Sequence, residues 1–191
     1  MNIMIMIKSV KDIRDHKFSG IEKRHGIYKW WFCDDCIHKL LTPLYPDVDY
    51  TTLKGMTGQH MIINNKGYTL LYVGIAAGRN GIRGRFKWHI AQNHSKSTIS
   101  KGYLSTLRRT LMGLLMNRST DTFYTFGEKR LNDFMDENCY LEWDYYNNVN
   151  KQGLEVIESM IINSGYYPLN IQGNNQTSNQ LKDKLKVLRK I

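Results

Sequence analysis

The sequence predicts a small mixed α/β (α+β) domain, because β-rich apolar runs alternate along the chain with segments of helical periodicity. The clearest strand is residues 26–32, a run rich in β-branched and aromatic side chains. A turn-rich tetrapeptide at residues 64–67 separates two further apolar runs and predicts an antiparallel hairpin. Apolar residues recur with helical spacing in segments 104–116 and 147–162.

The remaining elements follow from local signals along the chain. Pro43 ends the short helix expected after Asp34, and the stretch 44–58 has no clear period, so we expect an inserted loop there. The expected strands are 1–10, 26–32, 60–64, 68–75 and 139–146. The expected helices are 34–41, 82–93, 104–116, 127–138, 147–162 and a basic C-terminal helix at about 179–191.

Length and composition fit one globular domain. The chain has 191 residues, of which 41% are hydrophobic and 23% charged, so we treat 1–191 as a single domain with a core at about 21–172 and an insertion at about 33–60. The opening MNIMIMIK has no basic leader or cleavage site and reads as a strand. No stretch reaches the ~18 apolar residues of a membrane span, so we expect no membrane partner. Three cysteines, an odd number, favour a reducing, cytoplasmic location.

The charge distribution indicates a polyanionic partner. The formal net charge is +10, and the window from Tyr50 to Thr120 contains eleven Lys and Arg residues but no Asp or Glu. Nucleic acid is the commonest partner of such a window, and a basic face without a partner is the simpler alternative. The basic C-terminal helix is either a solvated helix or a further DNA contact. The candidate DNA-binding residues are Arg79, Arg83, Lys87, Lys101, Arg108 and Arg109.

One stretch of the basic window combines groups that suit a phosphodiester substrate. Tyr72 ends an apolar strand, a glycine-containing turn follows, and Arg85 and His89 stand four residues apart on the next predicted helix. That spacing places the two side chains on one helical face. A guanidinium, an imidazole and a phenol there supply a fixed positive charge, a proton carrier and a polarising hydroxyl.

A second cluster, Cys33, Cys36 and His38, raises the possibility of zinc. A structural zinc site needs four ligands, and no second Cys/His pair occurs at a matching spacing. We therefore interpret the cysteines as small apolar residues and keep zinc binding as an alternative.

The order of these residues resembles the GIY-YIG nuclease superfamily. Gly26-Ile27-Tyr28 and Tyr72-Val73-Gly74 look like the two halves of its signature, and Arg85, His89, an acidic residue on a late helix and Pro168-Leu169-Asn170 follow in the family's order. The resemblance spans residues 26–170. The two tyrosines are further apart than is usual in the family, which implies an insertion between the motif strands, and such a loop adds little closure entropy.

The resemblance implies a mostly antiparallel three-stranded sheet flanked by helices and a metal-dependent endonuclease that hydrolyses DNA. The implied catalytic residues are Tyr28, Tyr72, Arg85, His89, Glu158 and Asn170. Glu158 would hold one Mg²⁺ or Mn²⁺, Arg85 the phosphate oxygens, and Tyr28, with Tyr72 or His89, the attacking water. Asn170 would fix the loop or the glutamate by hydrogen bonds.

Several alternatives remain open. Arg83 competes with Arg85, which we prefer because a histidine lies four residues after it. Glu155 competes with Glu158, which we prefer for its spacing to Asn170. The protein is either a monomer or a homodimer. The competing functions are a non-catalytic nucleic-acid-binding module that keeps the fold, and an enzyme directed at RNA.

Overall fold

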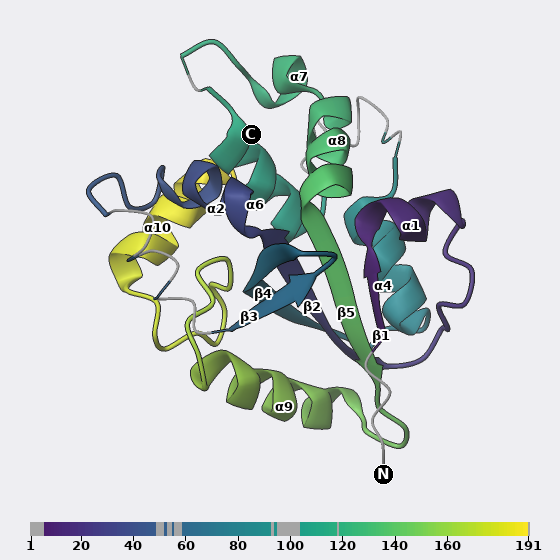
Figure 1. The fold of residues 1–191 in the computed structure, drawn as a ribbon. Helices are drawn as coiled ribbons and strands as arrows, with labels where there is room; N and C mark the ends of the chain where they lie inside the picture. The colour runs from purple at the N-terminus through teal and green to yellow at the C-terminus, as the bar shows by residue number, and fades with distance from the viewer. Residues whose placement is uncertain are drawn as a thin grey trace.

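The computed structural model describes residues 6–48, 52, 55, 59–92, 94, 104–117 and 119–190. Its centre is an antiparallel sheet which, within these residues, has five strands in the order β1-β5-β2-β4-β3 (Figure 1). The strands are β1 (Met6–Ser9), β2 (Gly26–Cys33), β3 (His60–Ile63), β4 (Lys66–Ala76) and β5 (Cys139–Tyr145).

The count of three strands that the family resemblance implied is wrong. The central strand β2 forms long pairings with β4 on one side and β5 on the other, and a four-residue strand is added at each edge. β1 pairs with the outer side of β5, and β3 pairs with the first residues of β4. Short edge strands of this kind limit the unpaired backbone that a sheet offers to other chains.

The β3–β4 hairpin forms where the turn chemistry predicts it. Asn64 and Asn65 have φ values of 49° and 63°, the left-handed conformation that asparagine tolerates and that a two-residue hairpin turn requires. Ile63 then pairs with Lys66 across the turn. The prediction of an antiparallel hairpin is confirmed.

Helices cover both faces of the sheet. The described helices are α1 (Val10–Asp15), α2 (Asp34–Leu41), α4 (Gly81–Ile90), α6 (Thr106–Leu115), α7 (Phe123–Phe126), α8 (Glu128–Asn138), α9 (Lys151–Asn163) and α10 (Asn179–Leu188). One apolar cluster joins α9 to the side chains of Ile27, Leu70 and Val73. The larger cluster, on the other face, packs residues of α1, α2, α4, α6, α8 and α10 against Tyr28 and Trp30. In Figure 1, α9 accordingly runs apart from the other helices, below the sheet.

The helix at Lys151–Asn163 starts later than its periodicity predicts. Asn148 has a φ of 60°, which interrupts a helix at that point. Asn150 then becomes the N-cap, and its side chain accepts a hydrogen bond from the N–H of Gly153 at 2.8 Å. This start fixes the direction of α9 and therefore the position of Glu158 on it.

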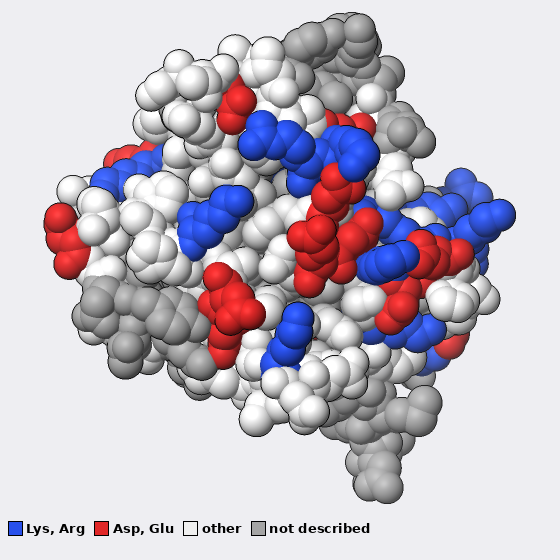
Figure 2. Space-filling view, turned by 45° about the horizontal axis from the view of Figure 1, so that its top comes forward, with Lys and Arg blue, Asp and Glu red and all other residues white. Residues whose placement is uncertain are grey.

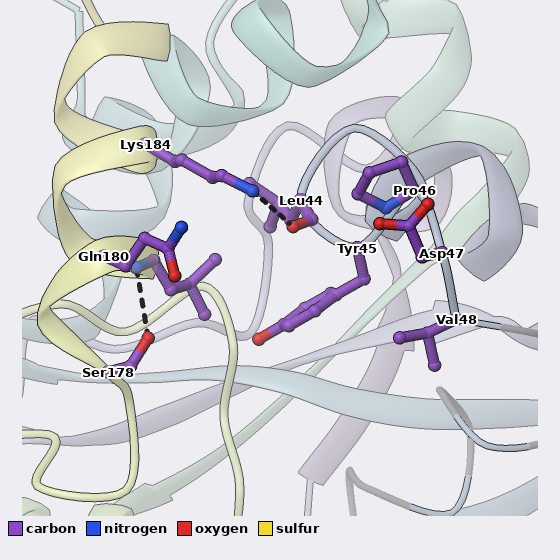
Figure 3. A pocket seen from close by; sticks show the side chains of 9 residues that line it. Leu44, Tyr45, Pro46, Asp47, Val48, Ser178, Gln180 and Lys184 are labelled. Carbon is purple, nitrogen blue, oxygen red and sulfur yellow. Dashed lines mark hydrogen bonds between the residues drawn. The ribbon is translucent and has the colours of Figure 1, made fainter.

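The basic C-terminal helix is docked against the body of the protein. Leu181 and Leu185 are buried, and the backbone of Leu188 lies so close to Gly113 of α6 that a Cβ there would come within 2.3 Å of its carbonyl oxygen. Lys184 donates to the carbonyl of Leu44 at 3.3 Å, beside a hollow of about 270 Å³ between α10 and the turns that follow α2 (Figure 3). The helix is therefore part of the packed domain.

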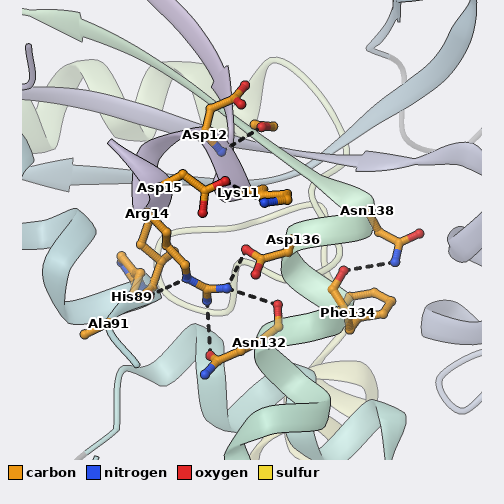
Figure 4. A network of polar contacts seen from close by, with 12 residues as sticks. Lys11, Asp12, Arg14, Asp15, His89, Ala91, Asn132, Phe134, Asp136 and Asn138 are labelled. Carbon is orange, nitrogen blue, oxygen red and sulfur yellow. Dashed lines mark hydrogen bonds and ion pairs between the residues drawn. The ribbon is translucent and has the colours of Figure 1, made fainter. Parts of the chain in front are cut away.

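A polar network ties three helices together near the end of α4. Arg14 of α1 donates to the carbonyl of Ile90 at 2.7 Å and to the side chain of Asn132 at 3.1 Å, and it forms an ion pair with Asp136 of α8 (Figure 4). The cost of burying the guanidinium is therefore offset by a carboxylate and by carbonyl oxygens.

In the described part of the chain, no helix has the length and apolarity needed to cross a membrane.

Candidate active site

The candidate site is built on an open edge of β4. β3 pairs only with Lys66–Thr69, so that beyond Thr69 this edge of β4 has no strand partner among the described residues. The backbone groups of Leu71, Val73 and Ile75 point outward there. Leu71 already accepts a hydrogen bond at 3.2 Å from the N–H of Leu169, in the Pro168-Leu169-Asn170 segment.

Asn170 takes the place of a strand partner at Val73. Its Oδ1 accepts from the N–H of Val73 at 2.9 Å, and its Nδ2 donates to the Val73 carbonyl at 2.8 Å. The side chain is only 5% exposed, so both backbone groups would otherwise be buried without partners. This pairing fixes the strand between Tyr72 and Gly74.

Ile75, two residues on, positions two charged side chains. Its carbonyl accepts from Nε of Arg85 at 3.3 Å, and its N–H donates to the carboxylate of Glu158. Arg85 is exposed and Glu158 is half-buried. The outward groups of Leu71, Val73 and Ile75 therefore bring the Asn170 segment, Arg85 and Glu158 to one edge, at every second residue.

Burial raises the pKa of Glu158 to about 7. The loss of solvation is the largest cause, and the negative charge of Glu155 acts in the same direction. The guanidinium of Arg85 and the N–H of Ile75 favour the carboxylate and offset part of the rise. Arg85 and the Ile75 N–H therefore do not fully replace the hydration that the Glu158 carboxylate has lost. Such a carboxylate favours the binding of a cation.

A second group of residues lies on the sheet face under α4. Oη of Tyr28 lies 2.8 Å from Nε2 of His89, and the ring centroids of these residues are 5.3 Å apart. The Tyr72 ring is 6.3 Å from that of Tyr28 and 6.4 Å from that of His89. Tyr28 and His89 are 1% and 2% exposed, whereas Tyr72 is partly exposed.

Both signature glycines are required by close packing. Tyr28 and Gly74 are cross-strand partners, and a Cβ on Gly74 would lie 2.4 Å from Oη of Tyr28. A Cβ on Gly26 would lie 2.2 Å from the carbonyl oxygen of Asp144 in β5. Gly74 therefore leaves room for the phenol of Tyr28, and Gly26 lets β2 approach β5.

The pKa shifts indicate that this group is neutral. Burial raises the pKa of Tyr28 well above its usual value, and burial also raises that of Tyr72, where a hydrogen bond with Tyr28 opposes the rise. The pKa of His89 lies well below its usual value because of burial and the nearby Arg85 and Arg108. At neutral pH, His89 is therefore an uncharged imidazole with one donor and one acceptor nitrogen.

All six residues expected to be catalytic lie around this end of β4. The two candidate glutamates differ in their surroundings. Glu155 is exposed and forms an ion pair with Lys151 at 3.3 Å, whereas Glu158 interacts electrostatically with Arg85. Arg85 also acts on the pKa of both tyrosines and of His89. These surroundings favour Glu158 over Glu155 and Arg85 over Arg83.

The expected DNA-binding residues fall into different environments. Arg79 is exposed and lines a hollow of about 340 Å³ together with Arg85 and Trp88. Lys87 is exposed with its ammonium 5.8 Å from the Phe18 ring. Arg83 is half-buried, Arg109 donates to the carbonyl of Arg189 at 2.7 and 3.1 Å, and Lys101 lies outside the described residues.

Arg108 was expected to contact DNA but is buried inside the protein. The side chain is 1% exposed and donates to the carbonyls of His89 and Ala91 at 3.0 and 3.2 Å, which satisfies the last turn of α4. It also pairs with Glu128 at 2.9 Å and donates to Asn132 at 3.0 Å. Its charge is used inside the protein, where it supports the helix that carries Arg85 and His89.

One face of the molecule is mixed in charge. On the face shown in Figure 2, Lys and Arg side chains are interleaved with Asp and Glu side chains. Folding brings acidic residues of α8 next to the basic window, as the Arg108–Glu128 pair shows.

The sequence analysis did not single out Ser105, which contacts His89, and included Arg189 only as part of the basic C-terminal helix. Oγ of Ser105 lies 2.9 Å from Nδ1 of His89 and is 2% exposed. Arg189 donates to Thr110 at 2.7 Å and lowers the pKa of Tyr72 through its positive charge. The expected helix at 104–116 placed Ser105 inside the helix, whereas the structure makes it the N-cap of α6 and brings it against His89.

The cysteines show no metal-binding arrangement. Cys33, Cys36 and Cys139 are free and buried, and burial raises the pKa of Cys36. Among the described residues, no group of three or more His, Cys, Asp or Glu side chains is arranged to hold a metal ion. The proposal of a metal at Glu158 therefore depends on one carboxylate together with water and substrate oxygens.

Comparison with known proteins adds one match. The family model of the GIY-YIG catalytic domain matches residues 26–191, from the first signature glycine to the end of the chain. No curated protein and no solved structure matches the chain.

Proposed function

Because this chain belongs to the family of the GIY-YIG catalytic domain, a nuclease domain, we propose that it is a metal-dependent endonuclease that hydrolyses DNA phosphodiester bonds. The observation that carries the proposal is the convergence at Ile75, where Arg85 and Glu158 bind the two backbone groups of one residue. The Tyr28–His89 pair lies on the adjacent sheet face. A cation site, a phosphate-binding guanidinium and a hydroxyl–imidazole pair are the parts that phosphodiester hydrolysis needs.

Glu158 is the residue that we propose to hold Mg²⁺ or Mn²⁺. Its half-buried carboxylate has a pKa of about 7 because the neighbouring Arg85 and Ile75 N–H do not fully replace its lost hydration. A divalent cation restores that balance, and Mg²⁺ commonly binds through one or two carboxylates while keeping several waters. When bound, the ion stabilises negative charge on the leaving oxygen.

Arg85 binds the non-bridging oxygens of the scissile phosphate in this proposal. Its Nε is held by the carbonyl of Ile75, and the exposed end of the guanidinium remains free to donate to an anion. The planar fork matches two phosphate oxygens, which an ammonium does not. Because the side chain is anchored at Nε, little further ordering is needed when substrate arrives.

Tyr72 is the hydroxyl that we propose to contact the attacking water. Tyr28 was expected in this role, but it is only 1% exposed, whereas Tyr72 is partly exposed and is the next group in the same hydrogen-bonded chain. Because the pKa values of both phenols are raised, the two tyrosines orient water as neutral hydroxyls. Nearby positive charge, such as that of Arg85, favours loss of the phenol proton.

The hollow beside Arg85 gives the DNA backbone a path away from the reacting phosphate. It is lined by Arg79, Asn80 and Trp88, all exposed, together with glycines. Arginine and asparagine bind phosphate oxygens, and an exposed indole stacks on a sugar or an unpaired base. Arg79 and Lys87 are therefore the strongest candidates for backbone contacts.

A plasmid-nicking assay in Mg²⁺ or Mn²⁺ tests the proposal. We expect wild-type protein to nick supercoiled DNA, and we expect Arg85→Ala and Glu158→Ala to lower the rate by roughly a hundredfold or more. Binding without cutting, unchanged by Glu158→Ala, would instead identify a non-catalytic nucleic-acid-binding module. Structured RNA in a parallel reaction tests the substrate class.

The products of the same assay report on oligomeric state. A monomer with one site releases nicked circles well before linear DNA, whereas a homodimer that cuts both strands in one encounter releases linear DNA directly. The sedimentation of the protein at the assay concentration provides the comparison.

A further inference from the structure

A hydrogen-bonded chain runs from α6 to the candidate active site through buried groups. Oγ of Ser105 lies 2.9 Å from Nδ1 of His89, and Nε2 of His89 lies 2.8 Å from Oη of Tyr28. Tyr28 is in turn hydrogen-bonded to Tyr72. The first three residues are 2%, 2% and 1% exposed, so water does not compete for these bonds.

The direction of this chain is set at its start by the N-cap of α6. Oγ of Ser105 accepts a hydrogen bond from the backbone N–H of Arg108 at 3.2 Å, and a backbone amide can only donate. Within the described residues, the other partner of Oγ is Nδ1 of His89. If Nδ1 carried the imidazole proton, Ser105 would accept twice and its buried hydroxyl hydrogen would have no acceptor, which is costly.

We propose that Ser105 is a positioning residue that holds His89 in the tautomer protonated at Nε2 and thereby directs Tyr28 to donate to Tyr72. Ser105 donates to Nδ1, Nε2–H donates to Oη of Tyr28, and the single hydroxyl hydrogen of Tyr28 is left for Oη of Tyr72. The effect on the reaction rests on the proposed function, whereas the tautomer of His89 is a property of the protein alone.

The protonation state of His89 agrees with this direction. His89 is neutral, since burial and the charges of Arg85 and Arg108 hold its pKa well below its usual value. A neutral imidazole must choose one nitrogen for its proton, so a fixed tautomer is meaningful here.

The consequence for the reaction lies at Tyr72. In this arrangement the oxygen of Tyr72 accepts a hydrogen bond from Tyr28. The hydroxyl hydrogen of Tyr72 is then left to contact the proposed water. In the opposite tautomer, Tyr28 donates to His89 and Tyr72 loses that bond. Ser105 therefore acts on the reacting group through two intermediates, without touching the substrate.

The test compares Ser105→Gly with Ser105→Thr. Glycine removes the hydroxyl but remains a tolerated N-cap, whereas threonine keeps both the hydroxyl and the cap. Ser9→Gly is the matched control, because Ser9 caps α1 by accepting from the N–H of Asp12 at 3.0 Å and does not contact His89. Thermal unfolding of the three variants shows whether each is folded.

Long-range ¹H–¹⁵N spectra of the metal-free protein report the tautomer directly, with the His89 signals assigned from their loss in His89→Gln. We expect Nε2–H in wild type, Ser105→Thr and Ser9→Gly, and a substantial Nδ1–H population in Ser105→Gly. A wild-type His89 protonated at Nδ1, or an unchanged tautomer in Ser105→Gly, would overturn the inference whether or not the protein cuts DNA.

Nicking kinetics then test the consequence. We expect Ser105→Gly to lower kcat roughly tenfold with little change in KM, because the water-orienting hydroxyl is affected and DNA binding is not. Ser105→Thr and Ser9→Gly should stay near wild type. A shifted tautomer with unchanged kcat would overturn the role in the reaction, whereas a wild-type protein that cuts no DNA would contradict the proposed function and leave the tautomer result standing.

Discussion

Asn170 pairs with both backbone polar groups of Val73, at 2.9 and 2.8 Å, in the position where a neighbouring strand would stand. Tyr72 precedes Val73 and Ile75 follows it by two residues, so this one pairing sets the register of the site. The asparagine therefore acts through the strand, as a replacement for sheet pairing, and the distances do not require it to contact substrate.

Removing the Asn170 amide should destabilise the protein. Asn170→Ala leaves the N–H and the carbonyl of Val73 buried without partners, at a cost of about 2 kcal/mol or more. We expect the melting temperature to fall by about 4–8 °C. Asn163→Ala is the control, since its amide bonds Ser159 and the N–H of Asn175 at the surface, where water can replace both partners, and should change little. Equal melting temperatures for the two variants would contradict this role.

Glu158 should make stability depend on pH in a defined direction. Its pKa of about 7 in the folded protein lies above its usual 4.5, so the native state binds more protons than the unfolded chain between these values. Stability is therefore lost as pH rises through 4.5 to 7. Glu158→Gln, which cannot ionise, should match wild type near pH 4.5 and exceed it at pH 8.

The stability gain of Glu158→Gln at pH 8 should be small, and Mg²⁺ provides a control for it. After discounting for the partial exposure of the carboxylate, we expect a gain of roughly 1 kcal/mol at pH 8 by thermal unfolding. Mg²⁺ should stabilise wild type at that pH and leave Glu158→Gln unchanged. A variant that is less stable than wild type at pH 8 would count against the raised pKa.

Arg108 should contribute to stability, and Arg79 to DNA binding. Arg108→Leu leaves Glu128 without its arginine partner and removes a donor from the end of α4, so we expect a loss of about 3 kcal/mol. Arg79→Leu removes an exposed charge and should leave the melting temperature within about 1 °C of wild type.

Salt dependence separates the two arginines further. If Arg79 neutralises a phosphate, Arg79→Leu should reduce the slope of log K against log salt by about 1. Arg108 should not affect that slope in protein that remains folded. A slope changed by Arg108→Leu, with stability unaffected, would restore Arg108 as a DNA contact.

Arg189 should assist the reaction from the end of the C-terminal helix. Its charge favours the deprotonated form of Tyr72, and it is fixed by Thr110 on one side and by Arg109 at its carbonyl. Arg189→Gln should lower kcat roughly tenfold. Lys186→Gln is the control, because Lys186 is exposed and pairs with Asp183. Equal rates for the two variants would leave Arg189 without a role.

Local signals in the sequence were sufficient for many elements. The helix at 34–41 and an antiparallel hairpin at the turn predicted for residues 64–67 both form, because helix starts and turns depend on neighbouring residues. The strands themselves were also recognisable. Their order was not, since β5 inserts between β1 and β2 through pairings more than 100 residues apart in sequence.

Part of the candidate site was also predictable from the sequence, and part depended on the fold. The family resemblance identified the six residues, but adjacent arginines such as Arg108 and Arg109 have the same charge in sequence and opposite environments in the fold. The burial of Arg108 depends on Glu128 and Asn132 of a later helix. Ser105 was missed for a similar reason, because its contact with His89 depends on how α6 docks beside α4.

The most direct measurement of the central claim is the single-turnover nicking rate of Glu158→Gln beside that of Glu155→Gln in Mg²⁺. Both variants remove one negative charge from α9, three residues apart, but only Glu158 accepts from Ile75 beside Arg85. We predict a loss of roughly a hundredfold or more for Glu158→Gln and a change of less than about threefold for Glu155→Gln. Equal rates for the two variants, or a wild-type protein that binds DNA and never cuts it, would contradict the account.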